Sequence, residues 1–299
     1  MRKVFKWLGI VLAALIVIVA LTALAGYVIS ERRINKTYTI ADEALTLPTD
    51  AASLAEGQRL ATMRGCSDCH APDFGGKVFI NDPMLGSIST ANLTGGEGSA
   101  TANYTVADWE RAIRHGIRPD GRGLLVMPSY EYAGLSDEQV AQMIAYLQTV
   151  EPVDRVAVEP RLQPLARALF LLGQLPLLPA EAVDHSAAHV ASVPAEASVR
   201  YGAYLSTTCT GCHHPDLAGG PTPGSAPGDP LAANLTPAGN LVNWTLDDFR
   251  NTLRNGVTPE GKVLDPAIMP WPIAAQMTDV ELEALWLYLQ SLPPSQPAG

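Results

Sequence analysis

The longest apolar segment of the chain lies close to its N-terminus. Residues 7–30 include no charged side chain, and most of them are apolar. A helix of about 20 apolar residues spans the hydrocarbon core of a membrane. A cleaved signal peptide is the alternative, because Ala23-Leu24-Ala25 is similar to a cleavage site. Apolar regions of signal peptides are usually shorter, about 7–15 residues, so the pattern favours a retained transmembrane anchor over residues 1–36.

Beyond this segment, apolar residues recur mainly with the spacing of helices. Ser136-x-x-Gln139 and Thr278-x-x-Glu281 are capping boxes, and each opens a segment with apolar residues on one helical face. Four more helices are predicted over residues 51–64, 105–116, 196–207 and 245–256. Two segments rich in Gly, Pro and Asn are predicted as loops, over residues 71–101 and 215–240. The pattern therefore predicts an all-α fold with long loops.

The second half of the chain repeats the motifs of the first half in the same order and at a nearly constant offset. Ala91-Asn92-Leu93-Thr94 recurs as Ala233-Asn234-Leu235-Thr236, and Met127-Pro128 recurs as Met269-Pro270. A repeat this long indicates domain duplication, because solenoid repeats are much shorter. We predict one domain over residues 37–155 and a second over residues 196–299.

The segment between the two copies, residues 156–195, is rich in proline and carries an apolar patch at residues 165–178. A free linker would be polar. We therefore predict that this linker packs against a domain or a partner, with a short helix around residues 165–172.

All four cysteines lie in two copies of the pattern C-x-x-C-H, Cys66 to His70 and Cys209 to His213. This spacing is typical of covalent c-type haem attachment, in which two thiols bind one edge of the haem and the adjacent histidine binds iron. A dithiol redox pair would explain one copy, but two copies inside a repeat favour haem. We predict two covalently bound haem c groups, attached at Cys66, Cys69, Cys209 and Cys212, with His70 and His213 as iron ligands.

A second axial ligand for each iron is predicted from the two Met-Pro pairs. Met127 follows Cys66, and Met269 follows Cys209, at almost the same separation along the chain. A thioether opposite histidine raises the reduction potential of haem iron. Met84 is the alternative in the first copy, but nothing in the second copy corresponds to it.

The remaining histidines are weaker candidates. His115 ends a predicted helix, where a cation suits the helix dipole, and a swapped axial ligand is the alternative. His185 and His189 would share a metal if helical, but solvent-facing linker positions are favoured, and His214 is predicted at the surface. Three arginines are candidates for holding haem propionates: Arg114, Arg118 and Arg254.

The charge of the chain is unevenly distributed. From residue 37 onward 14 basic residues face 29 acidic residues, a net charge of −15, whereas the whole chain has −10. Such a surface repels nucleic acid and attracts cationic partners. Solubility explains the same excess equally well.

With these motifs in place, the chain resembles a membrane-anchored dihaem cytochrome c. It is similar to the cytochrome c subunits of membrane-bound alcohol and aldehyde dehydrogenases and to dihaem modules of respiratory complexes, over about residues 40–156 and 195–293. The resemblance implies two tandem class I cytochrome c domains, whose first and last helices cross near Gly57 and Tyr146, and near Gly202 and Tyr288. The dehydrogenase subunits usually carry three haem motifs, whereas this chain carries two.

This resemblance implies an electron carrier between a membrane or periplasmic donor complex, either a dehydrogenase or a quinol-oxidising complex, and an acceptor such as a terminal oxidase or a soluble cytochrome. Its haem domains would lie on the periplasmic side of the inner membrane, in agreement with the basic N-terminus. We expect an electron-transfer subunit with redox partner proteins, with neither a small-molecule substrate nor nucleic acid. The alternatives are a peroxidase-like dihaem enzyme with one displaceable methionine and a structural subunit.

Overall fold

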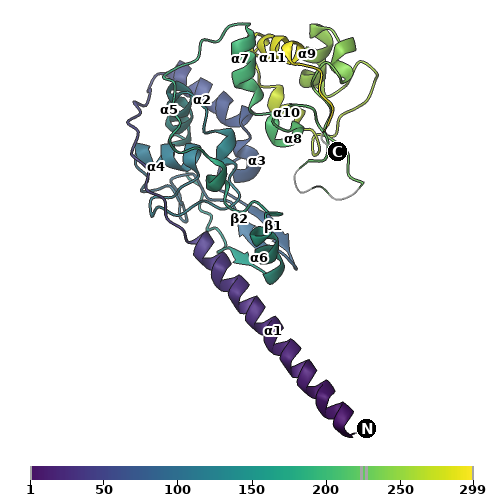
Figure 1. Cartoon of the computed structure of the whole chain (residues 1–299). Coiled ribbons are helices and arrows are strands. Elements are labelled where there is room, and N and C mark those ends of the chain that lie inside the picture. The colour runs from purple at the N-terminus through teal and green to yellow at the C-terminus, as the bar shows by residue number, and fades with distance from the viewer. Residues whose placement is uncertain (1, 223–224, 226–227, 298–299) are drawn as a thin grey trace.

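The computed structural model describes residues 2–222, 225 and 228–297. Its first element, helix α1 (Arg2–Ile34), extends away from the rest of the molecule (Figure 1). Among the described residues, α1 is the helix long and apolar enough to cross a membrane, and its apolar side chains are exposed. A signal sequence close to the N-terminus would have the same features. The apolar helix is therefore confirmed, and its retention as an anchor stays a prediction.

The two halves that follow α1 are built from corresponding short helices. The first half contains α2 (Ala51–Met63), α3 (Cys66–His70), α4 (Val106–Glu110) and α5 (Asp137–Leu147). The second contains α7 (Val199–Ser206), α8 (Thr210–His213), α9 (Leu246–Asn255), α10 (Trp271–Ala274) and α11 (Asp279–Ser291). Single π or 3-10 turns cover Arg111–His115, Ser129–Glu131, Pro179–Ala182 and Asn240–Asn243. One hydrophobic core runs through both halves, so their independence as domains stays a prediction.

Of the two predicted capping boxes, the one at Thr278 forms in full, and two further boxes form at the starts of α4 and α9. At α4, α9 and α11 the threonine hydroxyl accepts from the third helical backbone N–H, and the acidic side chain returns the bond. At α5 the Ser136 hydroxyl accepts from Gln139, but the Ser136 backbone N–H donates to the Tyr204 hydroxyl at 2.9 Å. Tyr204 in turn donates to the Gln139 side chain at 2.6 Å. A residue of the second half therefore completes a cap of the first.

Each half places a glycine where its first and last helices cross. A Cβ atom on Gly57 would lie 2.9 Å from the Cβ of Tyr146, and one on Gly202 would lie 2.6 Å from the Cβ of Tyr288. Real Cβ atoms do not approach one another this closely. The predicted crossings of α2 with α5 and of α7 with α11 are therefore confirmed.

Replacing Gly202 by alanine should destabilise the protein by about 1–3 kcal/mol, the usual cost of overpacking. The new methyl group would meet backbone atoms of Ala284, which have no rotamer to change. Denaturant unfolding measures the loss. Gly134→Ala is the control, because a Cβ at Gly134 meets no atom within 4 Å. Equal stability of the two variants would contradict a backbone-limited crossing.

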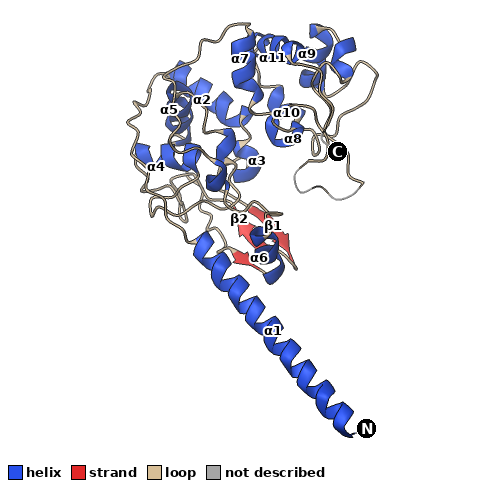
Figure 2. Ribbon diagram, in the orientation of Figure 1, coloured by secondary structure: helices blue, strands red, loops and turns tan. Residues whose placement is uncertain are grey.

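The fold is mainly helical but not all-α, so this part of the prediction needs correction. Strands β1 (Val78–Asp82), β2 (Gly86–Ser89) and β3 (Arg161–Leu162) form an antiparallel sheet in the order β1-β2-β3 (Figure 2). The sequence pattern predicted a loop at β1 and β2 and a linker at β3. Strands β1 and β2 form a local hairpin, and β3 joins it from far along the chain. Strands this short have a weak local pattern.

The linker packs, as predicted. Helix α6 (Pro164–Leu171) forms close to the expected range, and Phe170 and Leu177 are 1% and 0% exposed. Arg167 forms an ion pair with Glu31 of α1 at 2.9 Å. The sheet and α6 therefore lie at the end of α1 from which the chain enters the first half (Figure 1).

Candidate functional site

The first C-x-x-C-H segment forms the short helix α3, which follows α2 after Gly65 in the left-handed conformation. His70 is held by one specific contact, from its Nδ1 atom to the carbonyl oxygen of Ala91 at 2.8 Å. The Nδ1 proton donates to this carbonyl, so the lone pair lies on Nε2. Burial lowers the pKa of His70 and favours the neutral ring. A neutral imidazole with a fixed tautomer is the form that binds metal ions.

The repeated Ala-Asn-Leu-Thr segment explains how the Ala91 carbonyl is positioned. The Asn92 side chain accepts from the backbone N–H and the hydroxyl of Thr94, at 2.9 and 2.8 Å, and donates to the carbonyl of Val153 at 2.7 Å. Asn92 is fully buried. The tetrapeptide therefore fixes the backbone that holds His70.

A cavity of about 660 Å³ opens beside this motif. Cys66, Cys69, His70 and Met127 all line it, so the structure brings the four predicted residues of the first half together. Much of the remaining wall is apolar or aromatic and includes Leu93, Trp109, Ile113, Tyr132 and Leu147. Met84, the alternative ligand, is 65% exposed in the turn between β1 and β2 and is not part of the lining.

The second motif is built in the same way. His213, at the end of α8, is 6% exposed, and its Nδ1 lies 2.7 Å from the carbonyl oxygen of Ala233. Asn234 accepts from the backbone N–H and the hydroxyl of Thr236 and donates to the carbonyl of Ser295. Cys209 and Met269 pack against the hydrophobic core. Part of the loop over residues 215–240, at 223–224 and 226–227, lies outside the described residues.

The four cysteines, all of them among the described residues, form no disulfide with one another. Burial raises the pKa of Cys66 to about 12 and that of Cys209 to about 11. Reactive dithiol pairs instead have a lowered thiol pKa, which keeps one sulfur as the thiolate nucleophile. The environment therefore does not favour the alternative interpretation of these segments as dithiol redox pairs.

Among the arginines predicted to hold propionates, Arg118 alone lines the cavity. Its Nε atom is buried, lies 3.6 Å from Asp120 and makes no hydrogen bond to the described residues. Arg254 belongs to the second half, where it donates to the Ala275 carbonyl and to Asp279. Arg114 is fully buried and bonded to other groups. The prediction is therefore wrong for Arg114, and for Arg254 it stays a prediction.

Arg114 belongs to a polar cluster that sequence reasoning missed. Its guanidinium donates to Glu43 at 2.8 Å, to Glu110 at 3.3 Å and to Asp137 at 2.7 Å. His189 of the linker bonds to Glu43 at 2.8 Å and has a side chain only 6% exposed, so its predicted solvent position is wrong. The spacing of His185 and His189 was the available signal, but their partners are distant in the sequence.

His115 ends a helical turn before Gly116, as predicted, and joins this cluster instead of a haem motif. It is 2% exposed, and its Nδ1 lies 3.0 Å from Nδ1 of His185. Burial, together with His185 and His189, lowers the pKa of His115 to about 4. His115 is therefore neutral at pH 7, and the alternative of a swapped axial ligand has no geometric support.

The low pKa of His115 predicts acid sensitivity. A histidine in the unfolded chain titrates near pH 6.5, so below this pH the unfolded state binds more protons than the folded state. The free energy of unfolding should therefore decrease by on the order of 2–3 kcal/mol as pH falls from about 6.5 to about 4.

Denaturant unfolding of a His115→Gln variant should show a weaker dependence of the unfolding free energy on pH. His214→Gln is the control, since His214 lies on a surface loop, bonded to the Pro221 carbonyl. A His115→Gln variant as acid-sensitive as the original chain would contradict this prediction.

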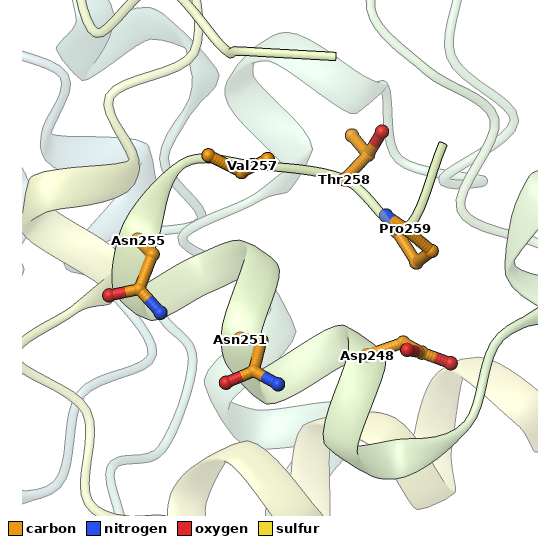
Figure 3. Close-up of a pocket in the computed structure, with 6 residues that line it drawn as sticks. All are labelled: Asp248, Asn251, Asn255, Val257, Thr258 and Pro259. Carbon is orange, nitrogen blue, oxygen red and sulfur yellow. The ribbon is translucent and has the colours of Figure 1, made fainter. Parts of the chain in front are cut away.

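A second hollow, of about 260 Å³, lies on the second half (Figure 3). Its walls come from α9 and the turn after it, with Asp248, Asn251 and Asn255 along the helix and Thr258 and Pro259 opposite. None of the predicted site residues lines this hollow. It therefore adds nothing to the candidate chemistry.

Comparison with known proteins assigns part of the chain to a known family. Residues 54–151 match the family model for cytochrome c. This part of the chain is a cytochrome c domain, and the family implies haem, iron and electron transfer.

Most of the chain is also similar to particular cytochrome subunits. It is 29% identical to the cytochrome c subunit of alcohol dehydrogenase (quinone) from Gluconacetobacter polyoxogenes, over 85% of this chain and 59% of that protein. It is 29% identical to the fructose dehydrogenase cytochrome subunit of Gluconobacter japonicus, over 85% and 56%. A diheme cytochrome c-type protein of Cereibacter sphaeroides is 28% identical, over 80% and 86%. The chain thus spans less than two thirds of the dehydrogenase subunits, and the peroxidase alternative receives no support.

Proposed function

We propose that this protein is a membrane-anchored dihaem cytochrome c that carries electrons from a donor complex to a downstream acceptor. The observation that carries the proposal is the matched pair of histidines. His70 and His213 each follow a cysteine pair, and each donates Nδ1–H to the first carbonyl of an Ala-Asn-Leu-Thr segment. A hydrogen bond of this kind orients an imidazole so that it presents Nε2 to a metal, and here it is duplicated.

The first site fits a haem in chemistry and in space. Its cavity has the size of ordinary ligand pockets, and its lining contains two thiols, one imidazole and one thioether. Cys66 and Cys69 would attach the haem, and His70 and Met127 would bind its iron. Arg118, whose buried Nε makes no hydrogen bond to the described residues, would face a propionate.

The second site would use Cys209, Cys212, His213 and Met269 in the same roles. Support comes from the equivalent placement of His213 and Ala233 and from the Met-Pro pair that precedes α11. We propose two haem c groups, one in each of two tandem cytochrome c domains, over residues 37–155 and 196–299.

When bound, haem supplies reversible one-electron chemistry. One histidine and one methionine of this chain would hold each haem iron. No position would then remain for a substrate. The apolar wall, with Trp109 and Tyr132, excludes water and so limits reorganisation of solvent. The protein would therefore act as an electron-transfer subunit, without catalysis of its own.

The relatives suggest the donor. Several are cytochrome subunits of dehydrogenases, so we propose a dehydrogenase subunit as the electron donor, in a complex at the periplasmic face of the inner membrane. Helix α1 would hold the carrier at this surface, where the effective concentration of membrane partners is high. The acceptor would be a terminal oxidase or a soluble cytochrome.

The haem count tests the proposal. Protein produced with a cytochrome c maturation system should contain two covalently bound haems per chain, measured by intact mass and by the pyridine haemochrome spectrum. Cys66→Ala with Cys69→Ala should remove one of them, and Cys209→Ala with Cys212→Ala should remove the other. One haem in the original chain would exclude the dihaem carrier.

A further inference from the structure

Arg64 is a buried arginine that lies between the two cysteine motifs. It ends α2, shortly before Cys66, and only 4% of its surface is exposed. Its Nη1 donates to the hydroxyl of Thr208, the residue directly before Cys209. The Arg64 side chain therefore extends from the residues next to the first cysteine motif to the residue next to the second.

The guanidinium is incompletely satisfied. Its Nε and Nη2 atoms are buried and make no hydrogen bond to the described residues. Burying a charge without full compensation is costly, so proteins seldom keep such a group without a role. Arg59, on the same helix, shows the ordinary solution: it is bonded to Glu56 and Glu281 at 2.6–2.8 Å.

Other contacts place the two motifs against one another. The carboxylate of Glu131 lies over Gly211, inside the second motif, so close that a side chain at this position would overlap it. The next residue, Tyr132, donates its hydroxyl to the Arg64 carbonyl at 3.0 Å. The turn that contains Glu131 and Tyr132 therefore contacts the flank of the first motif as well as the second motif. Helices α3 and α8 consequently lie on the facing sides of the two halves (Figure 1).

The charge of Arg64 acts on both motifs at once. Burial raises the pKa of Cys66 and of Cys209, and the positive charge of Arg64 lowers the pKa of both thiols. Electrostatic interactions are strong in such a dry environment, because the effective dielectric constant is well below that of water.

We propose that Arg64 is a positioning residue shared by the two haem sites: one buried positive charge that raises the reduction potential of both haems and joins their attachment motifs. The inference rests on the proposed dihaem function. Reduction adds an electron to the haem, so a nearby fixed cation stabilises the reduced form. Because Arg64 contacts the flanks of both motifs, removing its charge should affect both haems in the same direction.

The test is a spectroelectrochemical titration of the full-length protein carrying two haems. Arg64→Met should shift both midpoint potentials to lower values. Arg64→Lys keeps the charge and should leave both close to those of the original chain, although the bond to Thr208 weakens. Arg64→Gln is a second uncharged variant, which retains a donor for Thr208 in case the methionine variant assembles poorly.

Arg155→Gln is the control, because Arg155 is solvent-exposed and pairs with Asp73 at 2.8 Å, so that water screens its charge. Its potentials should stay unchanged. Two haems with unchanged potentials in Arg64→Met or Arg64→Gln would overturn the inference and leave the proposed function intact. A shift of one haem alone would overturn the shared role. A single haem in the original chain would instead overturn the proposed function itself.

Discussion

A Met127→Ala variant should bind carbon monoxide at its first haem after reduction, whereas the original chain should not bind it readily at either haem. Removal of the thioether opens one face of the iron, and the reduction potential of this haem should fall because sulfur favours the ferrous state. Axial ligands set haem potentials over a range of about 0.8 V, so the change should be easily measured. Redox titration and the carbon monoxide difference spectrum report the two effects.

Met84→Ala is the control for this experiment. Met84 is exposed and lies outside the cavity lining, so its replacement should change neither measurement. Met269→Ala should reproduce the Met127→Ala result at the second haem. Should neither methionine variant alter the spectrum, the irons have other ligands, and an enzyme with open sites replaces the carrier as the better interpretation.

An Arg114→Met variant should lose about 3–5 kcal/mol of unfolding free energy, the usual effect of leaving a buried charge without its partner. Arg114 is 0% exposed, and Glu110, its neighbour one helical turn earlier, is 1% exposed. Burial already raises the pKa of Glu110, and the Arg114 charge opposes that effect. Thermal or denaturant unfolding of the variant measures the loss.

Two further variants show whether charge is the cause. Arg114→Met combined with Glu110→Gln should recover part of the stability, because the uncompensated carboxylate is gone. Arg155→Met should cost at most about 1 kcal/mol, since its ion pair with Asp73 at 2.8 Å is solvent-exposed. If the double variant is no more stable than Arg114→Met, lost packing explains the effect better than charge.

Local patterns are sufficient to predict part of the fold. The apolar segment of α1 and the helix starts at Thr105, Thr245 and Thr278 occur as predicted. Capping depends on residues three positions apart, and an apolar segment is a matter of composition. Both properties are therefore visible in consecutive residues.

The errors share a different cause. The chain between Val78 and Leu162 contains three short strands that no local pattern indicates, and β3 lies far beyond β2 along the chain. Likewise, His189 meets Glu43 across 146 residues. Such contacts depend on how the whole chain packs, and neither spacing nor composition encodes them locally.

The amino-acid sequence alone specifies the chemistry: two cysteine pairs with their histidines, two Met-Pro pairs, and one apolar segment near the N-terminus. It does not reveal that Cys66, Cys69, His70 and Met127 line one cavity, or that Arg64 links the two motifs, and both facts come from the folded chain. The difference arises because covalent attachment requires neighbours along the chain, whereas cavities and buried charges form from segments that folding brings together.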